Sequence, residues 1–342
     1  MGYYLLKRLV LAVFTLFCIV FLSYVLLRLA PGDPTRSSIF GNDATAGTTS
    51  AEQSAFAENR SMRAKLHLDE PILVGFGYWL KDVVLHGDFG ESASVDPGRP
   101  VTELILSRLP VTLKLNTLAI LVTYSFAILL GIYSAVYAGG MFDKTTTVVL
   151  FVLYSLPVIW VGLILQAAFC AGGWLPIFPL KGLSVPNEED LSTFAAFWET
   201  AKCYVLPVTA LSYSGFAALS RYARGSMLEV LHADFIRTAR AKGVSSGEII
   251  FNHAFRNALV TLITLFSGLL PGLVSGSILI EYIFTIPGMG SLSLLALSSR
   301  DYPLQMALFT FAGMLTLLGI FFSDLLYVVA DPRISLTKGN NQ

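Results

Sequence analysis

The sequence predicts an all-α integral membrane protein that crosses the bilayer six times. Of its 342 residues, 54% are hydrophobic and only 13% are charged, and the mean hydropathy is +0.67. This composition leaves too little polar surface for a soluble chain of this length. Six apolar runs are long enough for membrane-spanning helices, and they cover residues 9–30, 112–138, 145–170, 203–222, 259–283 and 304–330.

The first apolar run is predicted to be an uncleaved membrane helix. It is too long for the apolar core of a signal peptide, and no pattern of small residues typical of a cleavage site follows it. Lys7 and Arg8 precede the run and place the amino terminus in the cytoplasm. Arg28, near its far end, can extend to the outer interface. Residues 1–30 therefore form the first segment of the chain.

The second segment, residues 31–111, is the one large polar stretch and is predicted to be extracytoplasmic. A Pro-Gly-Asp-Pro run beginning at Pro31 ends the first helix. Residues 41–59 are rich in Ser, Thr, Ala and Gly, which predicts a mobile or poorly ordered loop. Residues 71–85 carry apolar and aromatic side chains that favour a short helix on the outer rim of the membrane.

The distribution of charge predicts that both termini are cytoplasmic. Formal net charge is zero, so the charge balance does not indicate a nucleic-acid partner. The short segments predicted to be inside carry most of the basic residues, in agreement with the positive-inside rule. The remaining segments are a transmembrane core over residues 112–330 and a cytoplasmic tail over residues 331–342. The basic residues of these inner segments are Lys7, Arg8, Lys144, Arg221, Arg224, Arg237, Arg240, Lys242, Arg256, Arg333 and Lys338.

Two features distinguish the spans from one another. The fourth span is short and rich in Ala, Ser and Gly, which allows helices to approach closely and predicts a place inside the bundle. Pro157 and Pro271 lie within the third and fifth spans, where each can bend the helix. Bent, small-residue helices suit a pathway that opens and closes, although such residues are also common in any transmembrane bundle.

Few polar groups within the spans suggest chemistry. Asp324 is the only carboxylate well inside a span, and we interpret it as structural in preference to a substrate or proton site. Glu281 lies near the outer end of the fifth span. Cys170 and Cys203 both fall near the outer face, where a disulfide is possible, but two free and buried thiols are the preferred interpretation.

The stretch that organises the chain is the loop over residues 224–257. Leu228, Leu231 and Phe235, with Ala239 one turn further on, recur at helical spacing and predict a helix with one apolar face. Gly243 ends that helix, and Ser245 with Glu248 forms a capping box that opens a second one. From the pattern alone, this pair of helices either docks onto a partner or lies on the inner membrane surface.

The loop resembles the cytoplasmic coupling loop of bacterial ABC importer permeases. Within that superfamily it is similar to the first permease type of the oligopeptide, dipeptide and nickel branch, and details of residues 178–183 and 299–303 resemble the peptide and microcin C subgroup. The resemblance covers nearly the whole chain. It rests on Asp234, residues 237–243 and 253–258 of the loop, and on residues 142–143, 155–163, 177–183, 276–290, 299–303 and 323–333.

This resemblance implies the fold of a type I ABC importer permease and a set of partners. A second, related permease would complete the translocation path, two ATPase subunits would dock beneath it, and an extracytoplasmic binding protein would deliver the substrate. ATP and Mg would be bound by the ATPase subunits, so this chain would hold no cofactor and hydrolyse nothing. The residues implied to couple to the ATPase are Phe235, Arg237, Thr238, Ala239, Arg240, Ala241, Lys242 and Gly243.

Other functions find little support in the residues. The chain contains no Gly-Lys dipeptide and hence no phosphate-binding P-loop. Its histidines, His67, His86, His232 and His253, show no metal-ligand spacing, and none lies in a span where a protease would need one. The absence of an internal repeat weakens the alternative of a secondary transporter built from inverted halves. A permease of the same family for nickel or another small solute, an ion-coupled transporter and a membrane-anchored scaffold remain as alternatives.

Overall fold

The computed structural model describes residues 2–30, 63–64, 67, 69–170, 172–179, 182–183, 192–267, 273 and 277–330, without the side chains of 2–5, 260–261, 263–264, 266–267 and 323–330. Over these ranges the regular structure is helical, and one isolated bridge joins Glu91 to Pro100. The chain divides into two compact units, Met1–Pro110 with Gly288–Leu318 and Val111–Pro287 with Gly319–Gln342.

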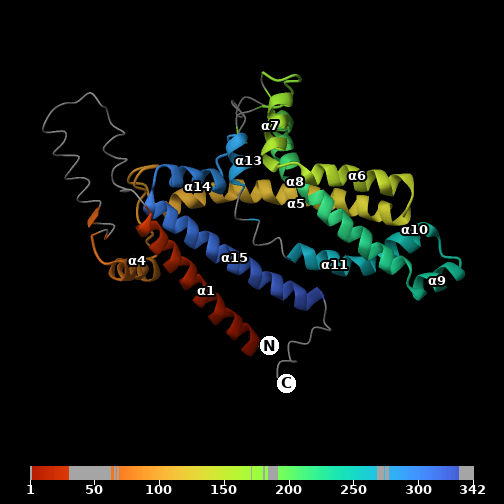
Figure 1. Cartoon of the computed structure of the whole chain (residues 1–342), viewed down its shortest axis with the longest axis horizontal. Helices are drawn as coiled ribbons and strands as arrows, with labels where there is room; N and C mark the ends of the chain where they lie inside the picture. Colours follow the sequence, from red (N-terminus) through yellow and green to blue (C-terminus); the bar gives the residue numbers. More distant parts are fainter. Residues whose placement is uncertain are drawn as a thin grey trace. The chain divides into compact units, whose positions relative to one another are not determined.

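The first unit contains helices from both ends of the chain: α1 (Gly2–Leu29), α4 (Ile72–His86), the start of α5 (Val101–Val136), α14 (Met289–Ser298) and most of α15 (Tyr302–Ala330). Figure 1 shows α1 and α15 running alongside each other. They approach closely because α15 has Gly313 at the contact, where an added Cβ would lie 3.3 Å from Leu16. The predicted helix on residues 71–85 is confirmed as α4, which ends at Gly87 in a left-handed conformation.

A buried carboxylate ties a loop to the start of α15 within the first unit. Asp301 is fully buried. Its Oδ2 accepts hydrogen bonds from the Ser92 hydroxyl and from the backbone N–H groups of Ser94 and Val95, while Oδ1 accepts from the Leu304 N–H in the first turn of α15. An aspartate in this position satisfies free N–H groups at a helix start, and here it also orders the preceding loop.

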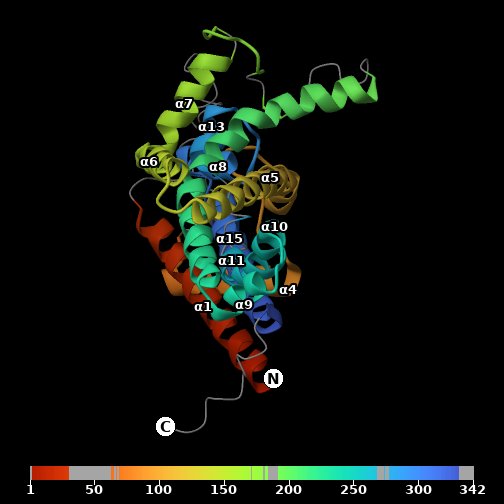
Figure 2. The same cartoon turned by 90° about the vertical axis from the view of Figure 1, so that its right-hand side faces the viewer.

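The second unit is built around α8 (Thr193–Leu231), which contacts α6 (Met141–Ser155), α7 (Val158–Phe169), α11 (Arg256–Ser267) and α13 (Ile278–Ile283). Figure 2 shows α8 as a long helix that leads at its C-terminal end towards α9 (Asp234–Ala241). Small residues bring α5 against α8: a Cβ on Gly131 would lie 2.5 Å from the Cβ of Ala223. Among the long apolar helices α8 has the largest buried share, which confirms its predicted interior place.

Four helices are long and apolar enough to cross a membrane, and α6 with α7 forms a fifth candidate if the pair is one span. The chain is therefore a helical protein with four or five candidate spans in the part that the structure describes. The predicted fifth span, residues 259–283, falls partly outside the described residues together with Pro271. The segment 41–59, the tail 331–342 and the Asp324 side chain also lie outside them, so those predictions stay predictions.

Several boundaries differ from those predicted. The helix α5 begins at Val101, before the predicted second span at residue 112, and continues through Pro110. Pro157 does more than bend the third span, because α6 and α7 meet at 96° across a break of extended residues, as Figure 1 shows. The fourth helix is much longer than residues 203–222: it begins after the Ser192 cap and runs 39 residues to Leu231. Polar residues such as Glu199 and Lys202, which pair at 2.6 Å on its surface, do not interrupt a helix. Cys170 and Cys203 are free and buried, as preferred.

Candidate functional site

The predicted coupling segment begins where α8 ends. The expected continuous helix through Leu228 and Phe235 is wrong, because the chain breaks between them. His232 closes α8, and Ala233 is extended before α9 begins at Asp234. The hydrophobic spacing that suggested one helix therefore continues across two helices of different direction. Spacing alone does not detect such a break, since neither His nor Ala is a strong helix breaker.

The residue that anchors α9 is Ile236, which the sequence interpretation missed. Its side chain is fully buried in a cluster with Met227 of α8 and Ile132 of α5. Ala239, one turn later, is half-buried against the same cluster. Phe235, expected on the apolar face, is instead 47% exposed. An Ile among basic and small residues, followed three residues later by Ala, was the available signal.

The eight predicted coupling residues lie together in α9 and the turn that follows it, and they form one largely exposed surface. We call this the α9 surface, and all of its residues are exposed apart from half-buried Ala239. Only weak contacts hold the charged members: Arg237 lies 3.5 Å from the Asp234 carboxylate, with both side chains mostly exposed. The α9 surface consists of Phe235, Arg237, Thr238, Ala239, Arg240, Ala241, Lys242 and Gly243.

The turn after α9 has the predicted glycine stop and the serine cap of the predicted capping box. Gly243 adopts a left-handed conformation with φ of 78°, and the following Val244 N–H donates to the Ala239 carbonyl. Ser245 then caps α10 (Ser246–Glu248) by accepting from the Glu248 N–H at 3.3 Å. The chain continues as a π-helix, Ile249–Phe255, into α11. Gly243 is therefore required by backbone geometry, since a Cβ there would be strained even though the space is open.

A partly buried ion pair holds the C-terminal part of α8 to the start of α6. Arg224 donates through Nε and Nη2 to the two carboxylate oxygens of Asp143, both at 2.7 Å. Asp143 also accepts from the Gly139 N–H at 2.9 Å, so its side chain is only 7% exposed. Because two parallel bonds join the groups, the pair fixes the orientation of the guanidinium as well as its distance from the carboxylate. This pair joins α6 to α8 within the second unit. Both residues were noted in the sequence, but nothing in their spacing joined them.

Glu281 is another carboxylate whose surroundings the sequence left open. It is fully buried in α13, where the Thr112 hydroxyl donates to its Oε1 at 3.0 Å. The carbonyl of Glu281 also accepts from the Ile286 N–H, which closes the turn that follows α13. Its position thus links α13 to the part of α5 that belongs to the second unit.

No set of three or more His, Cys, Asp or Glu side chains in the described ranges is arranged to hold a metal ion. The site is therefore a polar and basic surface on a short helix, followed by a tight turn.

Comparison with known families identifies the class of protein. Residues 127–336 match the family described as binding-protein-dependent transport system inner membrane component, and residues 1–116 match the N-terminal domain of the same proteins. The chain belongs to this family of transport permeases. The family resemblance inferred from the loop is thereby confirmed, and the chain is a multi-pass inner membrane protein.

Relatives of this permease match along its whole length. An oligopeptide transport system permease protein, AppB, of Bacillus subtilis is 35% identical over 98% of this chain and 99% of its own. A probable peptide ABC transporter permease, y4tP, of Sinorhizobium fredii is also 35% identical, over 98% of this chain and 99% of its own. A dipeptide transport system permease protein, DppB, of Bacillus subtilis is 32% identical over 99% of both chains.

Proposed function

We propose that this permease is a subunit of an ATP-driven ABC importer for peptides. Support comes from its relatives, which are named as oligopeptide, peptide and dipeptide permeases and are similar over nearly the full chain. It forms the translocation pathway with a second homologous permease and receives substrate from an extracytoplasmic binding protein. Two separate ATPase subunits bind ATP and Mg and carry out the hydrolysis. The same family membership is compatible with nickel or another small solute, which the transport assay below distinguishes.

In this proposal the chain crosses the membrane six times with both termini in the cytoplasm. Residues 31–111 lie outside the cytoplasm, residues 112–330 form the transmembrane core, and residues 331–342 form the tail. The basic residues of the short inner segments support this orientation. The loop over residues 224–257 then faces the cytoplasm, where the ATPase subunits are.

The α9 surface is proposed as the contact with the ATPase. This assignment rests on the burial of Ile236. It is a large apolar side chain of α9, and it is already buried within the permease. What remains outside is one aromatic side chain among basic, hydroxyl and small residues. A helix lying on a membrane needs a wide apolar face for the lipid, whereas a helix in a protein groove needs an aromatic anchor and small residues that permit close approach. The exposed composition favours the groove.

The decisive experiment compares two phenylalanines of the same loop. Phe235 and Phe251 are exposed to nearly the same degree, 47% and 48%, but only Phe235 belongs to the α9 surface. In the assembled transporter, F235A is expected to weaken retention of the ATPase subunits at least about tenfold, the loss typical of an interface anchor, and to reduce substrate-stimulated ATP hydrolysis. F251A is expected to retain both.

The readouts are co-purification from gently solubilised membranes, with mass identification of bound subunits, and uptake of labelled peptide or nickel. Recovery of the chain without an ATPase, also after crosslinking, would contradict the ABC importer and favour an ion-coupled transporter. Equal loss from F235A and F251A would contradict only the assignment of α9. Uptake of nickel without peptide uptake would contradict the substrate.

A further inference from the structure

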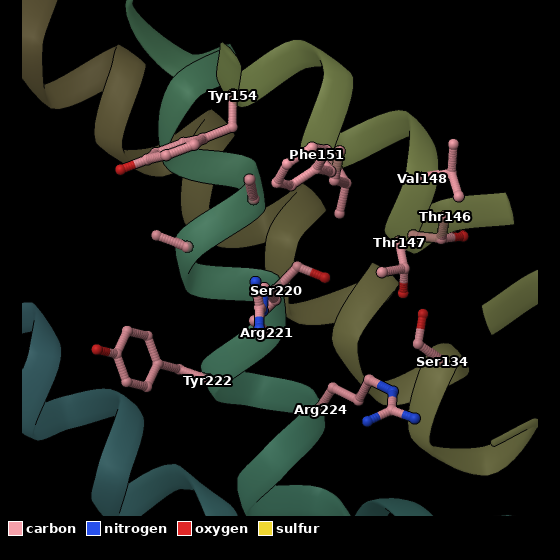
Figure 3. A pocket seen from close by; sticks show the side chains of 13 residues that line it. Ser134, Thr146, Thr147, Val148, Phe151, Tyr154, Ser220, Arg221, Tyr222 and Arg224 are labelled. Carbon is pink, nitrogen blue, oxygen red and sulfur yellow. The ribbon is translucent and has the colours of Figure 1, made fainter. Parts of the chain in front are cut away.

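A cavity of about 660 Å³ opens between α5, α6 and α8 of the second unit. Figure 3 shows side chains from all three helices around it. One part of its wall carries hydroxyl and guanidinium groups, including those of Ser134, Thr147 and Arg221. Another part is apolar and aromatic, with Phe151 and Ala218. The cavity therefore has a polar region and an apolar region, which is the pattern of an amphiphilic ligand.

Two polar groups in this wall have no partner in the part of the chain that the structure describes. The Ser134 hydroxyl is buried, with the residue only 2% exposed, and makes no hydrogen bond. In Figure 3 it points toward Thr147 on the facing helix. A buried hydroxyl without a partner costs free energy unless a ligand or water satisfies it. Arg221 lines the same cavity, and no hydrogen bond or ion pair joins it to any described residue.

The second arginine of the wall is held in place. Arg224 uses Nε and Nη2 for Asp143, so its guanidinium is fixed at the cavity while Nη1 makes no contact in that pair. The wall thus carries one guanidinium that is held in place and one that is exposed, together with hydroxyl groups, and such donors suit an oxyanion such as phosphate. The residues that line the cavity include no Asp or Glu. Because Arg224 is paired with Asp143, Arg221 supplies the unpaired positive charge of the wall.

The cavity lies at one level of the predicted membrane. Ser134 stands near the end of the second apolar run, Thr147 near the start of the third and Arg221 near the end of the fourth. Because successive spans alternate in direction, these three positions fall at the same membrane surface. Under the proposed topology this is the cytoplasmic surface, and that placement is the step that rests on the proposed function.

We propose that this cavity binds an anionic phospholipid of the inner leaflet. The phosphate lies between Arg221 and Arg224 and accepts from the hydroxyl of Ser134, while an acyl chain runs along the apolar wall that includes Phe151. Basic pockets between transmembrane helices on the cytoplasmic side are established sites for anionic headgroups. The lipid would also brace the Asp143–Arg224 pair at the base of α9, so its headgroup would influence how firmly the α9 surface is held.

The test measures lipid retained by the purified transporter. The complex is reconstituted in nanodiscs of phosphatidylcholine with increasing phosphatidylglycerol, extracted in mild detergent and analysed by native mass spectrometry, which separates a bound phospholipid from bound inorganic phosphate by mass. Wild type is expected to retain phosphatidylglycerol. R221Q should weaken retention about tenfold, the loss of one charge-assisted contact, and A218W should block the apolar wall from an exposed position.

Lys144 provides the matched control, because it is an exposed basic residue of α6 that does not line the cavity. K144Q removes the same charge nearby and is expected to leave retention unchanged. The proposal would be overturned if all three variants retained as much phosphatidylglycerol as wild type. It would also be overturned if R221Q and K144Q lost the lipid equally, or if only adducts of phosphate mass were found. The readout needs no ATP hydrolysis, so failed coupling at α9 would not affect it.

Discussion

Breaking the ion pair between Asp143 and Arg224 should destabilise the permease measurably. Exposed ion pairs contribute about 0–1 kcal/mol, whereas removing one partner of a buried pair costs about 3–5 kcal/mol. Here the carboxylate side chain is 7% exposed and the guanidinium 33%, so the pair lies between these cases. Two bonds of 2.7 Å in fixed geometry place the expected coupling free energy at about 2 kcal/mol.

A double-mutant cycle isolates that coupling, because D143A also removes the acceptor of the Gly139 N–H and the cycle subtracts this loss. The measurement is the free energy of unfolding in detergent titrated with a denaturing surfactant, for D143A, R224A and the double variant. The control cycle uses D234A and R237A, whose pair spans 3.5 Å between side chains that are 96% and 73% exposed. That cycle should give about 0–0.5 kcal/mol. Equal coupling in both cycles would refute the reasoning from burial.

Two further substitutions test packing and a buried carboxylate. G131V should destabilise the second unit by about 2–3 kcal/mol, because its side chain would overlap Ala223. The control G225A has open space around it and should be neutral or stabilise the unit by up to about 1 kcal/mol. Denaturant titration measures both free energies of unfolding, and equal effects would contradict the close approach of α5 and α8. D301N should cost about 3 kcal/mol, since a neutral amide weakens several charge-assisted bonds, and protease sensitivity of the 88–100 loop should rise. D88N, at an exposed residue with one local bond, should leave both unchanged.

Much of the candidate site followed from short-range signals. Gly243 and Ser245 were predicted to end one helix and begin another, and both do so, because left-handed φ and capping are properties of a few neighbouring residues. The exposed basic character of α9 was also expected. The identity of its anchor was not: periodicity placed Phe235 on the apolar face, and Ile236 is the buried side chain. A one-residue difference of this kind depends on the direction in which the helix leaves its neighbour.

The break at His232 and Ala233 and the sharp corner at Pro157 illustrate the same limit. A proline indicates that one backbone hydrogen bond is missing, but it does not predict the angle between the two helices that it separates. His232 gives no sequence signal that α8 ends there. In both places the angle is decided by what the next helix packs against, and that is a property of the whole unit.

By itself the sequence determined that this chain is an apolar, helical membrane protein with a basic loop between two apolar runs, and its resemblance to a known family indicated a permease. Those conclusions rest on composition, charge placement and local motifs, each of which is a sum over residues near one another in the chain. Only the tertiary structure decided that Asp143 meets Arg224, that Asp301 collects four donors, and that hydroxyl and guanidinium groups of three helices share one cavity. These are contacts between residues far apart in sequence. A buried polar group needs a hydrogen-bond partner, and the packing of the helices determines which residue is close enough to be that partner.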